Sequence, residues 1–182
     1  MATFVALLRG INVGSARKVP MSALRELCVK GGLVHPETYI QSGNLIVDAK
    51  TDADELRALL EGALRSQFGF AVDVIVRAAS AWSKYVAANP FAGKAEVLPN
   101  KLHLYLSRDR LSSGAAKILG QSAQSGERIR VASGALWIDY GANGVGGSKL
   151  TPALIDKACG SPATGRNWNT VLKIQAMIRA RT

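Results

Sequence analysis

The chain has 182 residues, of which 48% are apolar; this is enough to form one or two domains with a buried core and excludes general disorder. Lys and Arg number 23 against 13 Asp and Glu, so the formal charge is +10 at pH 7 and an acidic partner is favoured. The excess is uneven, because residues 91–182 hold 13 basic and 5 acidic residues while residues 1–90 hold 10 and 8.

The first two predicted elements are a strand and a helix. Residues 3–8 form a continuous apolar run that ends in a Gly-rich loop, which is typical of a central strand buried on both faces. Pro20 suits the first turn of a helix, in which apolar residues follow at positions 21, 24, 27 and 28 until two glycines stop the pattern. This spacing predicts an amphipathic helix that packs on the strand.

A second pair of strands and a second helix follow. Residues 38–40 and 45–47 predict strands, and the turn-forming residues 41–44 fit either a hairpin or one long bulged strand, of which we favour the hairpin. Carboxylates at residues 52–55 mark a helix start, and apolar residues recur at helical spacing up to position 64. The remaining elements predicted here are a strand at residues 72–76 and a short helix at residues 81–88.

The second half repeats the order of the first. Residues 89–100 contain three Pro and Gly residues and are predicted to be a linker between a lobe at residues 1–88 and a lobe at residues 101–182. The predicted elements after the linker are a strand at 102–106, a helix at 113–119, strands at 128–132 and 135–140, a helix from position 151 and a last helix at 167–178. Both halves read β-α-β-β-α, which predicts an α+β fold of two similar lobes, the second with an extra C-terminal helix.

Cysteine and histidine are too few and too scattered for a zinc site or a disulfide framework. Cys28, Cys159, His35 and His103 stand alone, so we expect a reduced, cytoplasmic protein with no metal and no cofactor. The apolar start has no basic residues before it, which argues against a signal peptide, and no stretch approaches the roughly 18 apolar residues of a membrane helix.

Five short strings are more specific than this general pattern. They are LLRGINVG (7–14), KVPM (18–21), TYIQSGN (38–44), SKL (148–150) and RNWNT (166–170). Together they resemble the bacterial family of domain of unknown function 1697 (DUF1697) over nearly the whole chain. The resemblance implies a two-lobed α+β protein whose first lobe is ferredoxin-like, and it implies no established activity. Gly165 departs from the pattern, since a better helix former is expected before the last helix.

The Gly-rich segment at residues 141–149 follows a strand and precedes a helix, where backbone N–H groups can bind phosphate. The order Gly-Gly-Ser148-Lys149 does not fit a Walker motif, so nucleotide hydrolysis of that type is excluded. Two interpretations stay open, namely an anion-binding turn with Lys149 at its rim and a flexible strand-to-helix connection.

Two loops of the first half carry polar side chains. Arg9, Asn12, Arg17 and Lys18 decorate the loop after the first strand, which lies at the usual place of a ligand crevice but also has the glycines of a simple tight exit. The hairpin tip offers the amide and hydroxyl groups of Gln41, Ser42 and Asn44, for which turn chemistry is an alternative explanation.

The RNWNT string combines Arg, Asn and Trp. On a helix, Arg166, Thr170 and Lys173 share one face, so the cations can grip a phosphate or carboxylate while Asn169 binds a planar group. In the alternative interpretation, Asn167 caps the helix, Trp168 anchors it and the cations are solvated.

Our leading hypothesis is binding of an anionic ligand, either nucleic acid or a phosphate-bearing small molecule, through the basic second lobe and a crevice between the lobes. The alternatives are a small-molecule enzyme with an interlobe site of Arg and Asn residues, and a plain interaction module. We expect the loop that follows the first strand and the RNWNT segment to approach each other, which would bring Arg9 near Arg166. Aromatic residues make up only 6% of the chain, so no RNA-binding strand signature supports sequence-specific stacking.

Overall fold

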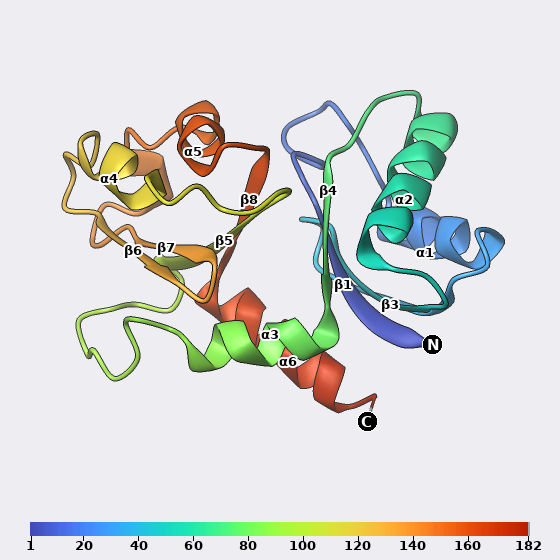
Figure 1. The fold of residues 1–182 in the computed structure, drawn as a ribbon. Helices are drawn as coiled ribbons and strands as arrows, with labels where there is room; N and C mark the ends of the chain where they lie inside the picture. The colour runs from blue at the N-terminus through green and yellow to red at the C-terminus, as the bar shows by residue number, and fades with distance from the viewer. Residues whose placement is uncertain (182) are drawn as a thin grey trace. The chain divides into compact units, whose positions relative to one another are not determined.

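The two halves of the chain repeat one order of elements in the computed structural model, which describes residues 1–181 (Figure 1). The first half contains β1 (Ala2–Leu8), α1 (Met21–Lys30), β2 (Val34–Tyr39), β3 (Asn44–Ala49), α2 (Ala53–Phe68), β4 (Val74–Ala78) and α3 (Ala79–Ala87). The second contains β5 (Leu102–Ser107), α4 (Ala115–Gly120), β6 (Arg128–Ala132), β7 (Ala135–Asp139), the 3-10 turn η1 (Val145–Gly147), α5 (Pro152–Cys159), β8 (Ala163–Asn167) and α6 (Trp168–Arg179).

Each half forms its own antiparallel sheet of four strands. The strand orders are β2-β3-β1-β4 and β6-β7-β5-β8, so equivalent strands occupy equivalent places. This β-α-β-β-α-β arrangement is the ferredoxin-like one. The predicted α+β fold with two similar lobes is therefore confirmed. None of the helices within residues 1–181 is both long and apolar enough to cross a membrane.

The chain divides into two compact units. The first is Met1–Trp82 together with the C-terminal end from Ala176, and the second is Ser83–Gln175. Residues 89–100, which the composition suggests as a linker, fall within the second unit and consist of successive turns.

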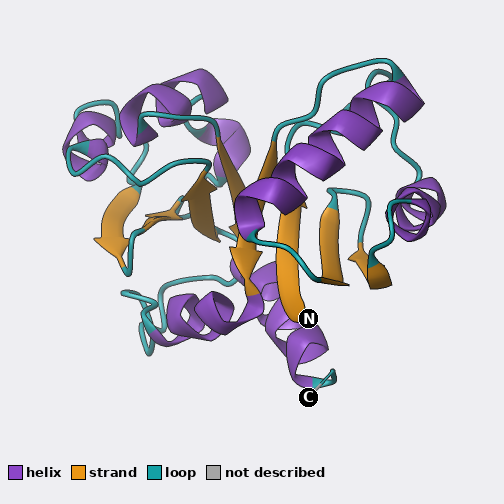
Figure 2. Cartoon of the chain, turned by 45° about the vertical axis from the view of Figure 1, so that its right-hand side comes forward, coloured by secondary structure: helices purple, strands orange, loops and turns teal. Residues whose placement is uncertain are grey.

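The core of the first unit follows from the periodicity of its sequence. β1 is central in its sheet, and its residues from Phe4 to Leu8 are all buried, as a continuous apolar run predicts. The four apolar positions predicted to face the strand in α1 are buried, and α2 buries Leu56, Leu60 and Leu64 while Leu59 is partly exposed. Asp52 caps α2 by accepting from the N–H groups of the first turn. Helices α1 and α2 cover one face of this sheet (Figure 2).

β8 is the element that the sequence analysis missed. The last helix begins at Trp168, and the five residues before it pair with β5 as an edge strand. The second half therefore ends in a strand and a helix, β8 and α6, as the first half ends in β4 and α3.

Gly165 lies in that strand and not in the last helix, which explains why a helix former is absent at this position. It stands opposite Tyr105 in the register of β8 and β5, and a Cβ atom at this position would lie 2.5 Å from the Tyr105 ring. Only glycine leaves room for the aromatic ring. The prediction that Arg166 shares a helix face with Thr170 and Lys173 is wrong, since Arg166 precedes the helix.

Candidate functional site

Asn12 organises the loop that follows β1. Its Nδ2 donates to the carbonyl oxygens of Val19 at 2.9 Å and of Gln41 at 2.8 Å, and its Oδ1 accepts from the Val19 N–H at 2.9 Å. One side chain thus closes its own loop and ties that loop to the tip of the β2–β3 hairpin.

The hairpin tip is fixed by a buried amide and a glycine. Asn44 is 1% exposed and donates from Nδ2 to the Tyr39 carbonyl and the Ser42 hydroxyl. Gly43 has a φ of 79°, and a Cβ atom there would lie 2.7 Å from the Leu8 Cβ. The predicted hairpin is therefore confirmed, and its turn requires glycine at position 43.

Left-handed backbone is concentrated in these two loops. Of the five non-glycine residues with positive φ in residues 1–181, three lie here, namely Asn12, Arg17 and Ile40. Ile40 is the least expected, because a β-branched residue disfavours this conformation and its side chain is still 49% exposed. Such strain costs about 1 to 3 kcal/mol and persists only where surrounding contacts impose it. We call residues 9–20 and 39–44 the two-loop cluster.

The cations of the two-loop cluster are held in different ways. Arg9 forms an ion pair with Asp73 at 3.2 Å. Arg17 donates to the carbonyl of Ala71 at 2.6 Å and lies 5.4 Å from the centroid of the Phe70 ring. Lys18, Gln41 and Ser42 are exposed. Polar groups from the two predicted segments are therefore brought together within the first unit.

The Gly-rich segment of the second unit is a closed turn. The backbone N–H groups of Gly147, Ser148 and Leu150 donate to acceptors within the turn itself. The Ser148 hydroxyl donates to the Glu127 carboxylate, and Lys149 Nζ donates to Gln124 Oε1 at 2.8 Å.

Glu127 makes this turn electronegative at one side. Burial alone would raise the pKa of Glu127, but the hydrogen bonds from Ser148, from its own backbone and from the Ser125 N–H lower it overall. The carboxylate is ionised at neutral pH and lies beside the N–H groups that were expected to attract an anion. These contacts favour a structural role for Ser148, and anion binding at Lys149 stays a prediction.

The RNWNT residues have separate environments in the second unit. Arg166 is buried and donates to the Thr164 hydroxyl and the Gly165 carbonyl, and burial lowers the pKa of its guanidinium to about 10. Asn167 Oδ1 accepts from the Thr170 N–H at 3.0 Å, so it caps α6. Asn169 and Lys173 are exposed on α6. Arg9 and Arg166 belong to different units, and their approach stays a prediction.

The two thiols of residues 1–181 are protonated at neutral pH. Burial raises the pKa of the Cys28 thiol to about 12 and of the Cys159 thiol to about 11, so neither is a thiolate at neutral pH. Burial lowers the pKa of His103. No group of three His, Cys, Asp or Glu side chains lies close enough to hold a metal ion in the described chain.

Most acidic side chains of the second unit are used internally. Arg128 pairs with Asp139 at 2.7 Å and with Glu96 at 2.8 Å. Asp156 accepts from the Ala163 N–H at 2.9 Å, and Glu127 is bound to Ser148. The exposed cations of this unit, by contrast, number eight: Lys84, Lys94, Arg110, Lys117, Arg130, Lys149, Lys157 and Lys173. Glu96 and Asp109 are the exposed carboxylates of this fully described unit.

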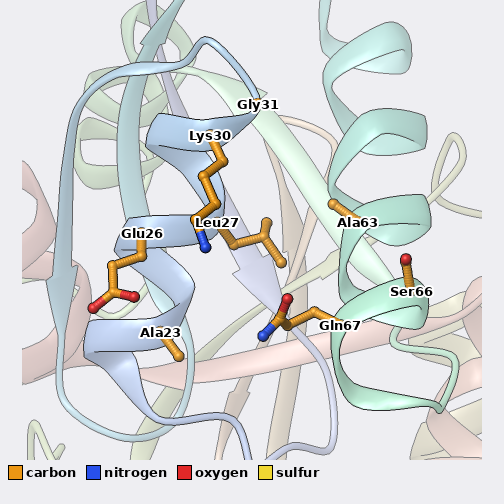
Figure 3. A pocket seen from close by; sticks show the side chains of 8 residues that line it. All are labelled: Ala23, Glu26, Leu27, Lys30, Gly31, Ala63, Ser66 and Gln67. Atoms are coloured by element: carbon orange, nitrogen blue, oxygen red, sulfur yellow. The ribbon is translucent and has the colours of Figure 1, made fainter.

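Two of the pockets contain no predicted site residue, although the second includes Trp168 of the RNWNT string. The first, of about 270 Å³, lies between α1 and α2, where Leu27 and Gln67 are directed toward each other (Figure 3). The second, of about 330 Å³, lies in the second unit around residues 89–102 and Trp168. Its segment has the Pro and Gly content of a linker, and the one signal in the sequence was an aromatic residue, Phe91, inside such a segment.

Comparison with known proteins supports the fold and the family. The structure of the conserved bacterial protein SP0830 from Streptococcus pneumoniae is similar, with a TM-score of 0.77 and 21% sequence identity over 97% of this chain and 98% of that one. A search of curated proteins finds no match. The model of the family described as protein of unknown function DUF1697 matches residues 1–137, so SKL and RNWNT lie beyond the matched range. The chain belongs to the DUF1697 family.

Proposed function

We propose that this protein binds single-stranded nucleic acid through the exposed cations of its second unit. The observation that carries the proposal is the imbalance of exposed charge, eight Lys and Arg against two carboxylates, one of which already pairs with Arg128. Because the other acidic side chains of the unit are engaged internally, the positive field is not cancelled at the surface.

Six of the eight exposed cations belong to two groups of elements. Helices α4 and α5 pack against each other and carry Lys117 and Lys157, with Lys149 just before α5 (Figure 1). The other group includes Lys84 of α3, Lys94 of the following turns and Lys173 of α6. Neither group forms a pattern that reads base edges, so contacts to the phosphate backbone are expected to provide the affinity.

We place this activity in the cytoplasm. Cys28 and Cys159 are buried free thiols, as expected for a reducing compartment.

Fluorescence anisotropy with labelled single-stranded DNA and RNA tests the proposal. We expect a dissociation constant in the micromolar range or weaker, which rises steeply between about 50 and 200 mM salt because phosphate contacts release counterions. Replacing Lys117, Lys149 and Lys157 together with Gln should weaken binding and flatten the salt dependence. The matched control replaces Lys30, Lys50 and Arg65, which are exposed in the first unit, with Gln. Absence of association with both nucleic acids at low salt would overturn the proposal.

A second function, binding of a small polar molecule, is favoured by the strain at the two-loop cluster. Backbone strain that surrounding contacts impose is typical of ligand sites. The exposed Gln41 and Ser42 side chains offer polar groups there, on a tip that Asn12 and Asn44 hold in place. Arg9 and Lys18 supply charge. Titration with a panel of small anions and amides, followed by NMR of the loop amides, tests it. Shifts confined to residues 9–20 and 39–44 support this function, and unchanged signals with every compound contradict it.

A further inference from the structure

The pocket in the second unit is built from an irregular segment and the start of α6. Its volume of about 330 Å³ falls within the range of small-molecule sites. Most of the lining is apolar, and it includes Phe91, Val97 and Pro99 together with the Trp168 side chain. Asn89 and Lys94 are the polar side chains of the lining.

The wall of this pocket is held by its own hydrogen bonds. Successive turns join Ala92 to Asn89, Lys94 to Phe91 and Val97 to Lys94. The backbone N–H of Trp168 donates to the Pro99 carbonyl at 3.0 Å, which fixes the segment to the start of α6. The pocket is therefore formed before any ligand arrives, which reduces the cost of ordering on binding.

An ion pair fastens the outer part of the wall to the sheet. Glu96 accepts from Arg128 of β6 at 2.8 Å, and Arg128 also pairs with the buried Asp139. The Arg128 guanidinium and the Lys94 ammonium lie 5.6 and 5.7 Å from the centroid of the Phe91 ring. Two cations thus lie at the aromatic side of the pocket, and Lys94 is exposed.

Trp168 gives the pocket an aromatic surface that solvent can reach. Trp82 and Trp137 are 0% exposed, whereas Trp168 is partly exposed. The centroids of the Trp168 and Trp137 rings are 5.6 Å apart. Any nucleobase can stack on such a side chain, because every base has a π face. A pocket that is apolar, aromatic and next to an exposed lysine suits a planar base that carries a phosphate.

We propose that this pocket binds an unpaired nucleobase, with Lys94 at the adjoining phosphate. This inference rests on the proposed function and deepens it, because it gives the basic unit one place where a base, and not only the backbone, is contacted. A free mononucleotide and a single-stranded nucleic acid share this chemistry.

The test compares a homopolymer of deoxyadenosine with an abasic strand of the same length and charge, at the same salt. Base stacking predicts that the homopolymer binds roughly tenfold more tightly than the abasic strand. Ala92 and Ala95 line the pocket and are exposed, so Ala95→Leu fills the space without disturbing the core and should remove the difference between the strands. Ala58→Leu, at an exposed position of α2 in the first unit, is the matched control and should retain it.

Tryptophan fluorescence gives a second readout with adenosine monophosphate as the probe. Because Trp168 is the accessible tryptophan among the described residues, its emission should be quenched on binding, and Ala95→Leu should prevent the quenching. Equal binding of both strands with unchanged fluorescence overturns the pocket proposal and leaves phosphate-backbone binding intact. Quenching by the mononucleotide without binding of either strand overturns the nucleic-acid function and supports the pocket as a mononucleotide site. No binding and no quenching overturn both.

Discussion

Asn12 and Gln41 are 29 residues apart in sequence, yet the Asn12 amide donates to the Gln41 carbonyl at 2.8 Å. The same side chain also makes both hydrogen bonds to the backbone of Val19. Two loops that leave different strands are thereby held in one conformation. The polar groups of the two-loop cluster are preorganised by this one residue.

Replacing Asn12 should destabilise the protein. Asn12→Ala removes three hydrogen bonds and places alanine, which tolerates left-handed backbone less well than Asn, at a φ of 55°. We therefore expect a loss of about 2 kcal/mol in the free energy of unfolding. Urea denaturation measures this loss. Asn12→Gly keeps the backbone conformation accessible and removes the same hydrogen bonds. Wild-type stability in the Gly variant would show that these hydrogen bonds contribute little.

Relieving the strain at Ile40 should stabilise the fold. Asn tolerates left-handed backbone far better than a β-branched residue, so Ile40→Asn should raise the free energy of unfolding by about 1 kcal/mol. Val13→Asn is the matched control, because Val13 is an exposed apolar residue of the neighbouring loop without positive φ. Thermal unfolding of the two variants measures the difference. If both changes have the same effect, side-chain polarity and not strain is the cause.

Gly165 should not tolerate even one additional methyl group. In Gly165→Ala the new Cβ would meet the Tyr105 ring, which is held by its contact with the Tyr140 hydroxyl at 2.8 Å, so the ring or the strand must move. Overpacking of this kind costs about 1 to 3 kcal/mol. Gly120→Ala serves as the control, because no atom lies within 4 Å of a Cβ there and the change should be neutral or slightly stabilising. Equal stability of the two variants in urea would contradict the close packing.

The same glycine explains where sequence reasoning succeeds and where it fails. The strands at residues 128–132 and 135–140 and the helix from position 151 were predicted, because turn residues and helix-start residues are local signals. β8 was missed because it contains a glycine, which weakens a strand signal in the sequence. That glycine leaves room for the Tyr105 ring of the neighbouring strand β5. Such a requirement is visible only after the strands are paired.

The candidate site shows the same division between local and distant signals. The polar residues in the loop after β1 and at the hairpin tip were singled out from their places next to predicted strands, but their connection through Asn12 depends on sheet pairing. The buried Glu127 was not singled out, since nothing near it in sequence indicates that it binds Ser148, 21 residues away.

Acid should destabilise the first unit because Asp48 becomes protonated. Burial alone would raise the pKa of this carboxyl, but hydrogen bonds from Thr3 and His35 and the charge of Arg181 lower it below the ordinary value of 3.8. A group whose pKa is lower in the folded state stabilises the protein above its unfolded pKa, and this contribution is lost as pH falls through the folded value. Asp48→Asn should therefore flatten the decline in unfolding free energy below about pH 4.

Chemical denaturation between about pH 2 and 6 measures that decline. Asp54→Asn is the control, because Asp54 is exposed and forms its ion pair with Arg57 of its own helix. The same acid profile in wild type and Asp48→Asn would show that Asp48 is not the responsible group.

Glu127 decides whether the Gly-rich turn can bind an anion. The turn has the glycines, the following helix and the lysine that anion sites use, but the ionised Glu127 carboxylate accepts hydrogen bonds from the Ser148 hydroxyl of the turn and from the Ser125 N–H. A phosphate would meet like charge there, and the N–H groups of Gly147, Ser148 and Leu150 already have acceptors. We therefore expect inorganic phosphate to bind weakly at Lys149 in the wild-type protein and to shift the amide NMR signals of residues 146–150 only slightly, and more strongly once the Glu127 charge is removed. Glu127→Gln keeps the shape and removes the charge, so phosphate should shift those signals in this variant, and Lys149→Ala added to it should abolish the shift. Shifts of equal size with and without the carboxylate would mean that Glu127 does not control anion access and that Lys149 is sufficient to bind phosphate.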